Sequence, residues 1–141
     1  MSVSSIPSFD RTVQKTNQWL DELMASMGWF DPERAYLALR TTLHTLRDRL
    51  TIEEAAELGA QLPMLVRGFY YEGWRPTGKP VKERHKDEFL AHIDKALAGY
   101  DLGSSEEIAR GVFRLLNRRV SEGEMEDVQS ILPHEIRELF H

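Results

Sequence analysis

The chain of 141 residues contains no cysteine, which excludes disulfide frameworks, thiolate zinc sites and cysteine nucleophiles together. It also lacks any apolar run near the roughly twenty residues that a membrane helix needs. The polar start, Met1 to Ser8, lacks the basic and then apolar pattern of a signal peptide. A chain of this length can bury its own core as one domain. We therefore expect a single globular domain in the cytoplasm, without a membrane span.

Positive charge is scarce, because the formal net charge is −5. Nucleic-acid binding depends on clustered Lys and Arg that neutralise phosphates, so a nucleic-acid partner is not expected. One stretch, from Arg75 to Lys86, departs from this balance, with a single acid, Glu83. Its basic residues are Arg75, Lys79, Lys82, Arg84 and Lys86. A solvated basic loop is the simplest interpretation, and contact with acidic lipid or nucleic acid is the alternative.

Catalytic signatures are missing as well. No serine lies in a Gly-x-Ser-x-Gly context, no glycine-rich phosphate loop opens a helix, and no aspartate cluster resembles a calcium loop. The sequence therefore predicts no catalytic residue and no cofactor.

An internal repeat is the most informative feature that is present. The segment from Leu50 to Arg67 recurs without a gap from Val120 to Arg137, at a constant offset of seventy residues. Further pairs are Thr51 with Ser121, Glu54 with Glu124, Leu58 with Val128, and Leu62-Pro63 with Leu132-Pro133. A constant offset indicates one helical unit that is used twice.

Helical periodicity supports this interpretation. Leu39, Leu43, Leu46 and Leu50 fall at i, i+4, i+7 and i+11, which is one face of a helix. The second copy repeats the face with Ala109, Phe113, Leu116 and Val120. Capping boxes, which open short helices, are found at Thr51-Ile52-Glu53-Glu54 and at Ser121-Glu122-Gly123-Glu124. No stretch alternates as a strand does, so we predict an all-α fold, a compact bundle of about eight helices built from two tandem four-helix pseudo-repeats.

The same patterns set the expected boundaries. Residues 1–9 form an N-terminal tail and residues 10–141 a single helical domain. Its first helix runs from about Asp10 to Ala25 or slightly beyond. The first repeat covers about 10–71 and the second about 82–141. The breakers Gly73, Pro76, Gly78 and Pro80 place a connector at about 72–81.

Several motifs resemble the all-helical bacterial family catalogued as domain of unknown function 2267. They are Leu43 to Leu50, Glu53 to Pro63, Gly68-Phe69-Tyr70-Tyr71-Glu72-Gly73-Trp74, Glu88-Phe89-Leu90 and Val128 to Leu139. The resemblance covers about Asp10 to the last residue. It implies a compact helical domain of the bacterial cytoplasm, and it supplies no activity, cofactor or catalytic residue.

The best candidate surface for a ligand or partner surrounds the connector. Aromatic faces and guanidinium groups suit stacking and anion recognition, and connectors carry function more often than cores do. The candidate residues are Tyr70, Tyr71, Trp74, Arg75, Arg84 and His85. The structural alternative is that the three aromatic rings fix the connector against the seam between the repeats.

A metal set is the second candidate. His85, Glu88 and His92 lie at i, i+3 and i+7 on the predicted fifth helix, and zinc or iron accepts two imidazoles and a carboxylate. Positions i and i+7 are about 10.5 Å apart along a helix axis, so a solvated flank is the competing interpretation.

Two functional hypotheses follow. The first is a non-enzymatic helical domain of otherwise unknown function. It binds a partner protein or a small ligand, or self-associates, through the connector and the seam between the repeats. The alternative is a metal-dependent enzyme with ligands His85, Glu88 and His92, and with Glu72 as general base.

Overall fold

The structure, a computed structural model, describes residues 4–141. In this range the chain forms eight α-helices and a closing 3₁₀ turn, η1, and no β-strand. The elements are α1 (Pro7–Met27), α2 (Pro32–Arg47), α3 (Ile52–Ala60), α4 (Met64–Tyr71), α5 (Lys86–Ala96), α6 (Ser105–Arg119), α7 (Glu122–Ser130), α8 (His134–Arg137) and η1 (Glu138–Phe140). The predicted compact all-α fold is confirmed.

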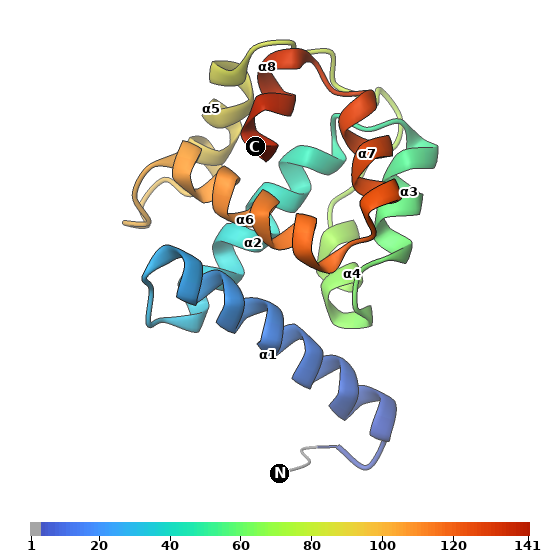
Figure 1. Cartoon of the computed structure of the whole chain (residues 1–141), viewed down its shortest axis with the longest axis vertical. Helices are drawn as coiled ribbons and strands as arrows, with labels where there is room; N and C mark the ends of the chain where they lie inside the picture. The colour runs from blue at the N-terminus through green and yellow to red at the C-terminus, as the bar shows by residue number, and fades with distance from the viewer. Residues whose placement is uncertain (1–3) are drawn as a thin grey trace.

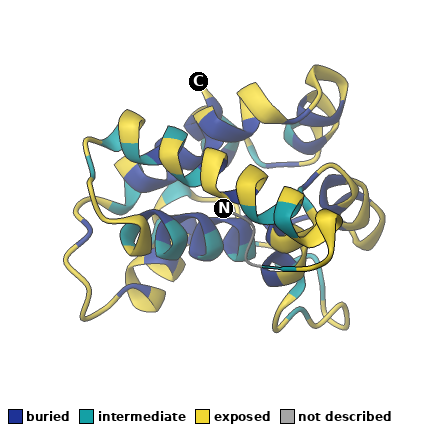
Figure 2. Ribbon diagram, turned by 90° about the horizontal axis from the view of Figure 1, so that it is seen from below, coloured by how far each residue is buried: buried dark blue, intermediate teal, exposed yellow. Residues whose placement is uncertain are grey.

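The helices α2 and α6 contact each other at the centre of the molecule, and the other helices pack around them (Figure 1). Leu43 and Leu46 of α2 and Phe113 and Leu116 of α6 have no exposed surface. Buried segments turn inward and exposed ones outward along most helices (Figure 2). The apolar faces that the sequence periodicity predicted therefore meet in one core.

Short polar side chains begin several helices by binding free backbone N–H groups. Asp31 accepts a hydrogen bond from the backbone of Glu33 at 3.0 Å, immediately before α2. Thr51 accepts from the backbone of Glu54 at 3.1 Å and begins α3. These N-caps satisfy donors that a helix leaves unpaired, and each contributes about 1 kcal/mol.

The first helix begins earlier than the sequence pattern indicated. Pro7 occupies the first turn of α1, where its missing N–H costs no hydrogen bond. Residues 7–9 therefore belong to the helix rather than to the predicted tail, and residues 1–3 of that tail lie outside the described residues. The N-terminal half of α1 extends beyond the body of the bundle (Figure 1).

The connector between the halves is also longer than predicted, because the non-helical chain continues to His85 and α5 begins at Lys86. The connector is fixed to the end of α2. The backbone N–H of Val81 donates to the Asp48 carbonyl at 2.8 Å, and Arg49 pairs with Glu83. The connector is thus an anchored segment that returns along α2.

Equivalent hydrogen bonds recur at the same offset in the two halves. Arg67 Nη2 donates to the Leu62 carbonyl at 3.0 Å, and Arg137 Nη2 donates to the Leu132 carbonyl at 2.9 Å. Ser121 caps α7 as Thr51 caps α3. The halves differ in length elsewhere, since α1 has 21 residues and α5 has 11. The tandem pseudo-repeat stays a prediction, with which these paired contacts agree.

Candidate functional site

Tyr70 lies inside the core. It is fully buried, and its hydroxyl donates a 2.7 Å hydrogen bond to the Ala55 carbonyl of α3. Burial raises the pKa of the Tyr70 phenol far above its usual value, with smaller contributions from neighbouring groups. Its ring therefore joins α4 to α3 and is not exposed to a partner at the surface.

Tyr71 and Trp74 are half-buried and pack on each other, with ring centroids 5.5 Å apart. Tyr71 also covers Gly59 of α3 so closely that a methyl group there would collide with the Tyr71 hydroxyl. Arg75 and Arg84 are exposed in the connector. The structure thus joins the aromatic rings of the predicted surface to the bundle and leaves its arginines in solvent.

The predicted metal residues make separate contacts. His85 Nδ1 lies 2.9 Å from a Glu135 carboxylate oxygen of α8, and His92 Nε2 lies 2.8 Å from Glu83. Glu88 accepts a hydrogen bond from the His85 backbone, so it caps its own helix. The hydrogen bond and charge of Glu135 raise the pKa of His85.

Among residues 4–141, the metal-ligand atoms that converge in a group of three or more belong to other residues, and none comes from His85, Glu88 or His92. Helix geometry supplies the physical reason, because seven residues separate the two imidazoles along α5 by about 10.5 Å. The metal-dependent enzyme is therefore not favoured. Its predicted general base, Glu72, lies near Arg40, with the two side chains 3.5 Å apart.

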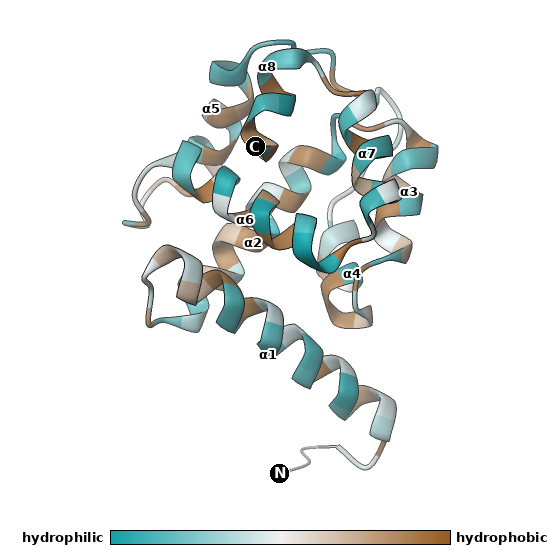
Figure 3. Cartoon of the chain, viewed as in Figure 1, coloured by the Kyte–Doolittle hydropathy of each residue, from teal (hydrophilic) through white to brown (hydrophobic). Residues whose placement is uncertain are grey.

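An apolar groove of about 800 Å³ runs along α1, α4 and the start of α2. Its two walls touch where the backbone N–H of Leu65 donates to the Thr12 hydroxyl at 2.9 Å. One wall is a stripe of α1 at helical spacing, formed by Phe9, Thr12, Val13, Thr16, Asn17 and Leu20. Three residues on the two walls are large exposed apolar side chains: Phe9 at 48%, Met64 at 47% and Leu65 at 44%. The sequence of α4 is predominantly hydrophobic, and Figure 3 colours much of this helix brown.

Gly68 lies on the α4 side of this apolar groove. A Cβ atom built there meets no atom within 4 Å, so no contact inside the protein requires a glycine. Glycine inside a helix costs roughly 0.5–1 kcal/mol relative to alanine. The missing side chain leaves the helix backbone open toward the groove, which allows a bound chain to approach closely.

Four carboxylates meet where α3 contacts α7. One oxygen from each of Glu54, Glu57, Glu124 and Asp127 lies within 4.8 Å of those of the other three, and we call this group the four-carboxylate cluster. Glu54 is 9% exposed and Glu124 is 7% exposed, whereas the other two are open to solvent. The i, i+3 spacing on each helix turns both of its carboxylates to one side.

The cluster lacks balancing positive charge. Among the described residues, no Lys, Arg or His forms an ion pair with any of its members. Burial, the neighbouring carboxyl of Glu124 and that of Glu57 raise the pKa of Glu54 to about 9. Like charges in a poorly solvated place disfavour ionisation, so the cluster favours an additional positive charge.

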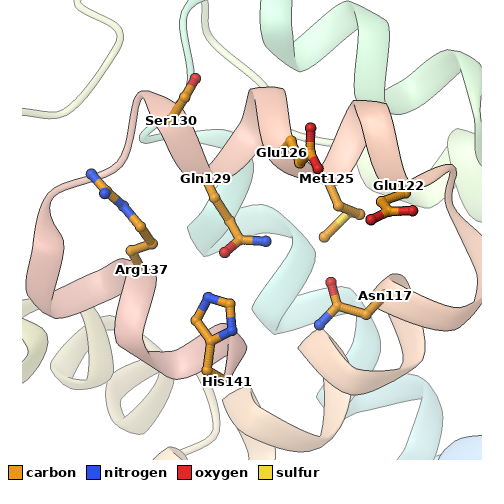
Figure 4. Close-up of a pocket in the computed structure, with 8 residues that line it drawn as sticks. All are labelled: Asn117, Glu122, Met125, Glu126, Gln129, Ser130, Arg137 and His141. Atoms are coloured by element: carbon orange, nitrogen blue, oxygen red, sulfur yellow. The ribbon is translucent and has the colours of Figure 1, made fainter.

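Another pocket, of about 610 Å³, opens between α6, α7 and the C-terminal segment (Figure 4). Gln129 and His141 line it at the positions that correspond to Gly59 and Tyr71 in the first half. Side chains of both charge signs surround the pocket, among them Glu122 and Arg137, without a common charge. We assign no ligand to it.

The fold and these sites define a small all-α domain with an apolar groove and an acidic seam. No described helix is long and apolar enough to cross a membrane. A family model described as an uncharacterized conserved protein, DUF2267, matches residues 16–139, so the chain belongs to this family. A comparison with curated proteins finds no match.

Sequence reasoning did not identify the apolar groove or the four-carboxylate cluster as sites. A signal for the cluster was present, because Glu54-x-x-Glu57 recurs as Glu124-x-x-Asp127 at the offset of seventy. The comparison of the two halves paired Glu54 with Glu124 but left out Glu57 and Asp127. The groove has a weaker signal, since it depends on how α1 packs against α4.

Proposed function

We propose that the protein is a non-enzymatic helical domain whose apolar groove binds an amphipathic helix of a partner protein. The observation that carries the proposal is a groove in which an α1 wall, apolar at Phe9, Val13 and Leu20, faces exposed Met64 and Leu65. Grooves between helices bind partner helices through apolar residues spaced at i, i+3 or i+4, and i+7. We also propose that the protein acts in the cytoplasm.

The shape of the groove supports a helix as the occupant. The α1 wall runs from Phe9 to Leu20, which corresponds to about three helical turns. Its floor is made by Tyr36 and Phe69, whose rings pack edge to face with centroids 5.3 Å apart. Because Gly68 adds no side chain, a partner helix is able to lie close to α4.

Charge supports the same occupant. The charged residues that line the groove are Glu33 and Glu72, and no Lys or Arg lines it. A partner helix with apolar residues on one face and Lys or Arg at the edge of that face would complement Glu33, while Glu72 already lies near Arg40. Such charge complementarity accelerates encounter and selects orientation more than it adds affinity.

A display library of helical peptides, randomised on one face, tests the proposal directly. We expect the wild-type protein to enrich peptides with apolar residues at helical spacing and a basic flank. Gly68→Leu fills the groove and improves helix propensity, so it should weaken binding of these peptides at least tenfold while α4 stays folded. Phe9→Ser should weaken binding as well.

Phe30 provides the matched control, because it is 98% exposed and does not line the groove. Phe30→Ser should leave peptide binding unchanged. The proposal fails if no peptide is enriched, or if enriched peptides bind the Gly68→Leu variant as tightly as the wild type. Light scattering that shows a dimer, which Phe9→Ser converts to a monomer, would assign the groove to a second copy instead.

The surface predicted around Tyr71, Trp74 and Arg84 stays a separate prediction. The rings of Tyr71 and Trp74 contact each other and are half-buried, whereas Phe9, Met64 and Leu65 of the groove are exposed. A Trp74→Ala, Arg84→Ala double variant that retains helicity should bind the enriched peptides as the wild type does. A loss of binding in this variant would move the partner surface to the connector.

A further inference from the structure

The four-carboxylate cluster is independent of the apolar groove, and its geometry is that of a ligand set. Four carboxylate oxygens from two neighbouring helices lie within 4.8 Å of one another. Donor atoms on opposite sides of a Ca²⁺ ion, at bonds of about 2.4 Å, are about 4.8 Å apart. The four oxygens therefore lie within the span of one Ca²⁺ coordination sphere.

Two members of the cluster are buried and lack partners. Glu54 and Glu124 are 91% and 93% buried, as their exposed fractions of 9% and 7% show. The Oε1 atom of each is shielded from solvent and receives no hydrogen bond from the described residues. Buried carboxylate oxygens without a donor are costly, so a bound positive charge at this place would relieve both.

Several acidic side chains outside the cluster have basic partners. Glu106 pairs with Arg110 and Lys86, and Glu22 pairs with Arg118 and Arg119. Arg67 lies on α4, the helix that follows α3. It donates to the carbonyls of Gly59 and Leu62 and not to the cluster. Exposed acids such as Glu33 and Glu53 also lack an ion pair with any described residue, but in the cluster two of the unpaired acids, Glu54 and Glu124, are buried.

The donor set indicates the class of ion. All four donors are carboxylate oxygens, with no histidine or cysteine, and hard ions such as Ca²⁺, Mn²⁺ and Mg²⁺ prefer oxygen ligands. Glu57 and Asp127 are exposed, so water is able to complete the coordination on that side. Ca²⁺ accepts irregular sets of several carboxylates, whereas Mg²⁺ requires near-octahedral geometry and retains several waters, so the donor set favours Ca²⁺ over Mg²⁺.

We propose that Glu54, Glu57, Glu124 and Asp127 bind one hard divalent cation of calcium size, which joins α3 to α7. These helices belong to different halves of the chain, so the cation would act as a clamp between the halves. Two hydrogen bonds already align the helices, because the Gln61 amide donates to the Ser121 hydroxyl and accepts from the Ser121 backbone. A cation that binds the folded chain but not the unfolded chain also stabilises the fold by mass action.

The test uses full-length protein without a His tag, treated with a chelator and then titrated with CaCl₂, MnCl₂ or MgCl₂. We expect isothermal titration to give one Ca²⁺ per chain, Mn²⁺ to compete for it, and the melting temperature to rise with Ca²⁺. Mg²⁺ should bind more weakly than Ca²⁺.

The Glu54→Gln, Glu124→Gln double variant keeps the shape of both side chains and removes two charges. It should fold without metal and bind Ca²⁺ at least tenfold more weakly than the wild type. Glu53→Gln is the matched control, since Glu53 is an exposed neighbour of Glu54 outside the cluster. This variant should bind Ca²⁺ as the wild type does.

Two results would overturn the proposal. One is the absence of binding heat and of any rise in melting temperature with Ca²⁺ and Mn²⁺ up to millimolar concentrations. That result would mean that a proton shared between the carboxyl groups, and not a cation, offsets their repulsion. The other is Ca²⁺ binding that the double variant retains at wild-type strength.

Discussion

Two of the contact seams between the first and second halves of the chain differ in their charge: one pairs opposite charges and the other brings like charges together. Where α1 contacts α6, Glu22 lies 2.9 Å from Arg119 and 3.4 Å from Arg118. Where α3 contacts α7, the four-carboxylate cluster brings like charges together, and two of its members are buried. Exposed ion pairs contribute little to stability, whereas like charges removed from water oppose folding. The second seam therefore indicates a ligand, and the first needs none.

The largest expected effect comes from removing one buried charge from the cluster. In chelator-treated protein at pH 8, we expect Glu54→Gln to raise the free energy of unfolding by about 3 kcal/mol. The gain arises because Gln needs no proton and is able to donate to a neighbouring carboxylate. Urea denaturation measures it, with Glu53→Gln as the control. A destabilised Glu54→Gln variant would contradict the repulsion on which the comparison depends.

The pH dependence of this gain is the next effect. A folded-state pKa of about 9 for Glu54 means that the folded chain binds a proton more tightly than the unfolded chain does. The stability that this tighter proton binding gives to the folded chain is complete below the ordinary Glu pKa of 4.5. It is lost as the pH rises toward 9. The difference between Glu54→Gln and the wild type should therefore grow with pH, by on the order of 1 kcal/mol per unit.

Urea denaturation of both proteins between pH 5 and pH 9, in chelator, measures this slope. A difference that stays constant with pH would mean that Glu54 titrates alike in the folded and unfolded chains.

The charged seam of α1 and α6 should behave in the opposite way. Glu22→Gln removes attraction, so we expect it to lower the free energy of unfolding by about 0.5 kcal/mol. High salt should abolish this loss, because the pairs are partly exposed and screened. Stabilisation by Glu22→Gln would show that the two seams do not differ as we describe.

The smallest effect concerns His85, whose pKa Glu135 raises above the usual 6.5. NMR titration of the imidazole should give a midpoint above that value, and Glu135→Gln should lower it toward 6.5. Glu138→Gln on the next turn is the control and should leave the midpoint unchanged. An unchanged midpoint in Glu135→Gln would show that Glu135 does not raise the pKa of His85.

The sequence predicted the helices well, because their signals are local. Apolar spacing at 3.6 residues per turn placed Leu46 and Leu116 in the core, and hydroxyl caps marked the starts of α3 and α7. Tyr70 was assigned to the candidate surface around the connector, whereas the structure buries it against α3. The start of α1 was placed too late, because proline in the first turn was not used as a signal.

The candidate sites were harder to predict, because they depend on contacts between distant segments. His85 is the N-cap residue of α5 and His92 lies within that helix, yet each contacts a carboxylate from another segment. Glu57 and Asp127 are ordinary exposed acids when each helix is considered alone. Only the packing of α3 against α7 brings them together, and no local pattern specifies that packing.

An anomalous difference map from a crystal grown with Mn²⁺ tests the central claim most directly. We predict one strong peak between α3 and α7, bound by Glu54, Glu57, Glu124 and Asp127 at about 2.2 Å, near the range of hard cations. A map in which Mn²⁺ lies elsewhere, and in which the four side chains point apart, would contradict it.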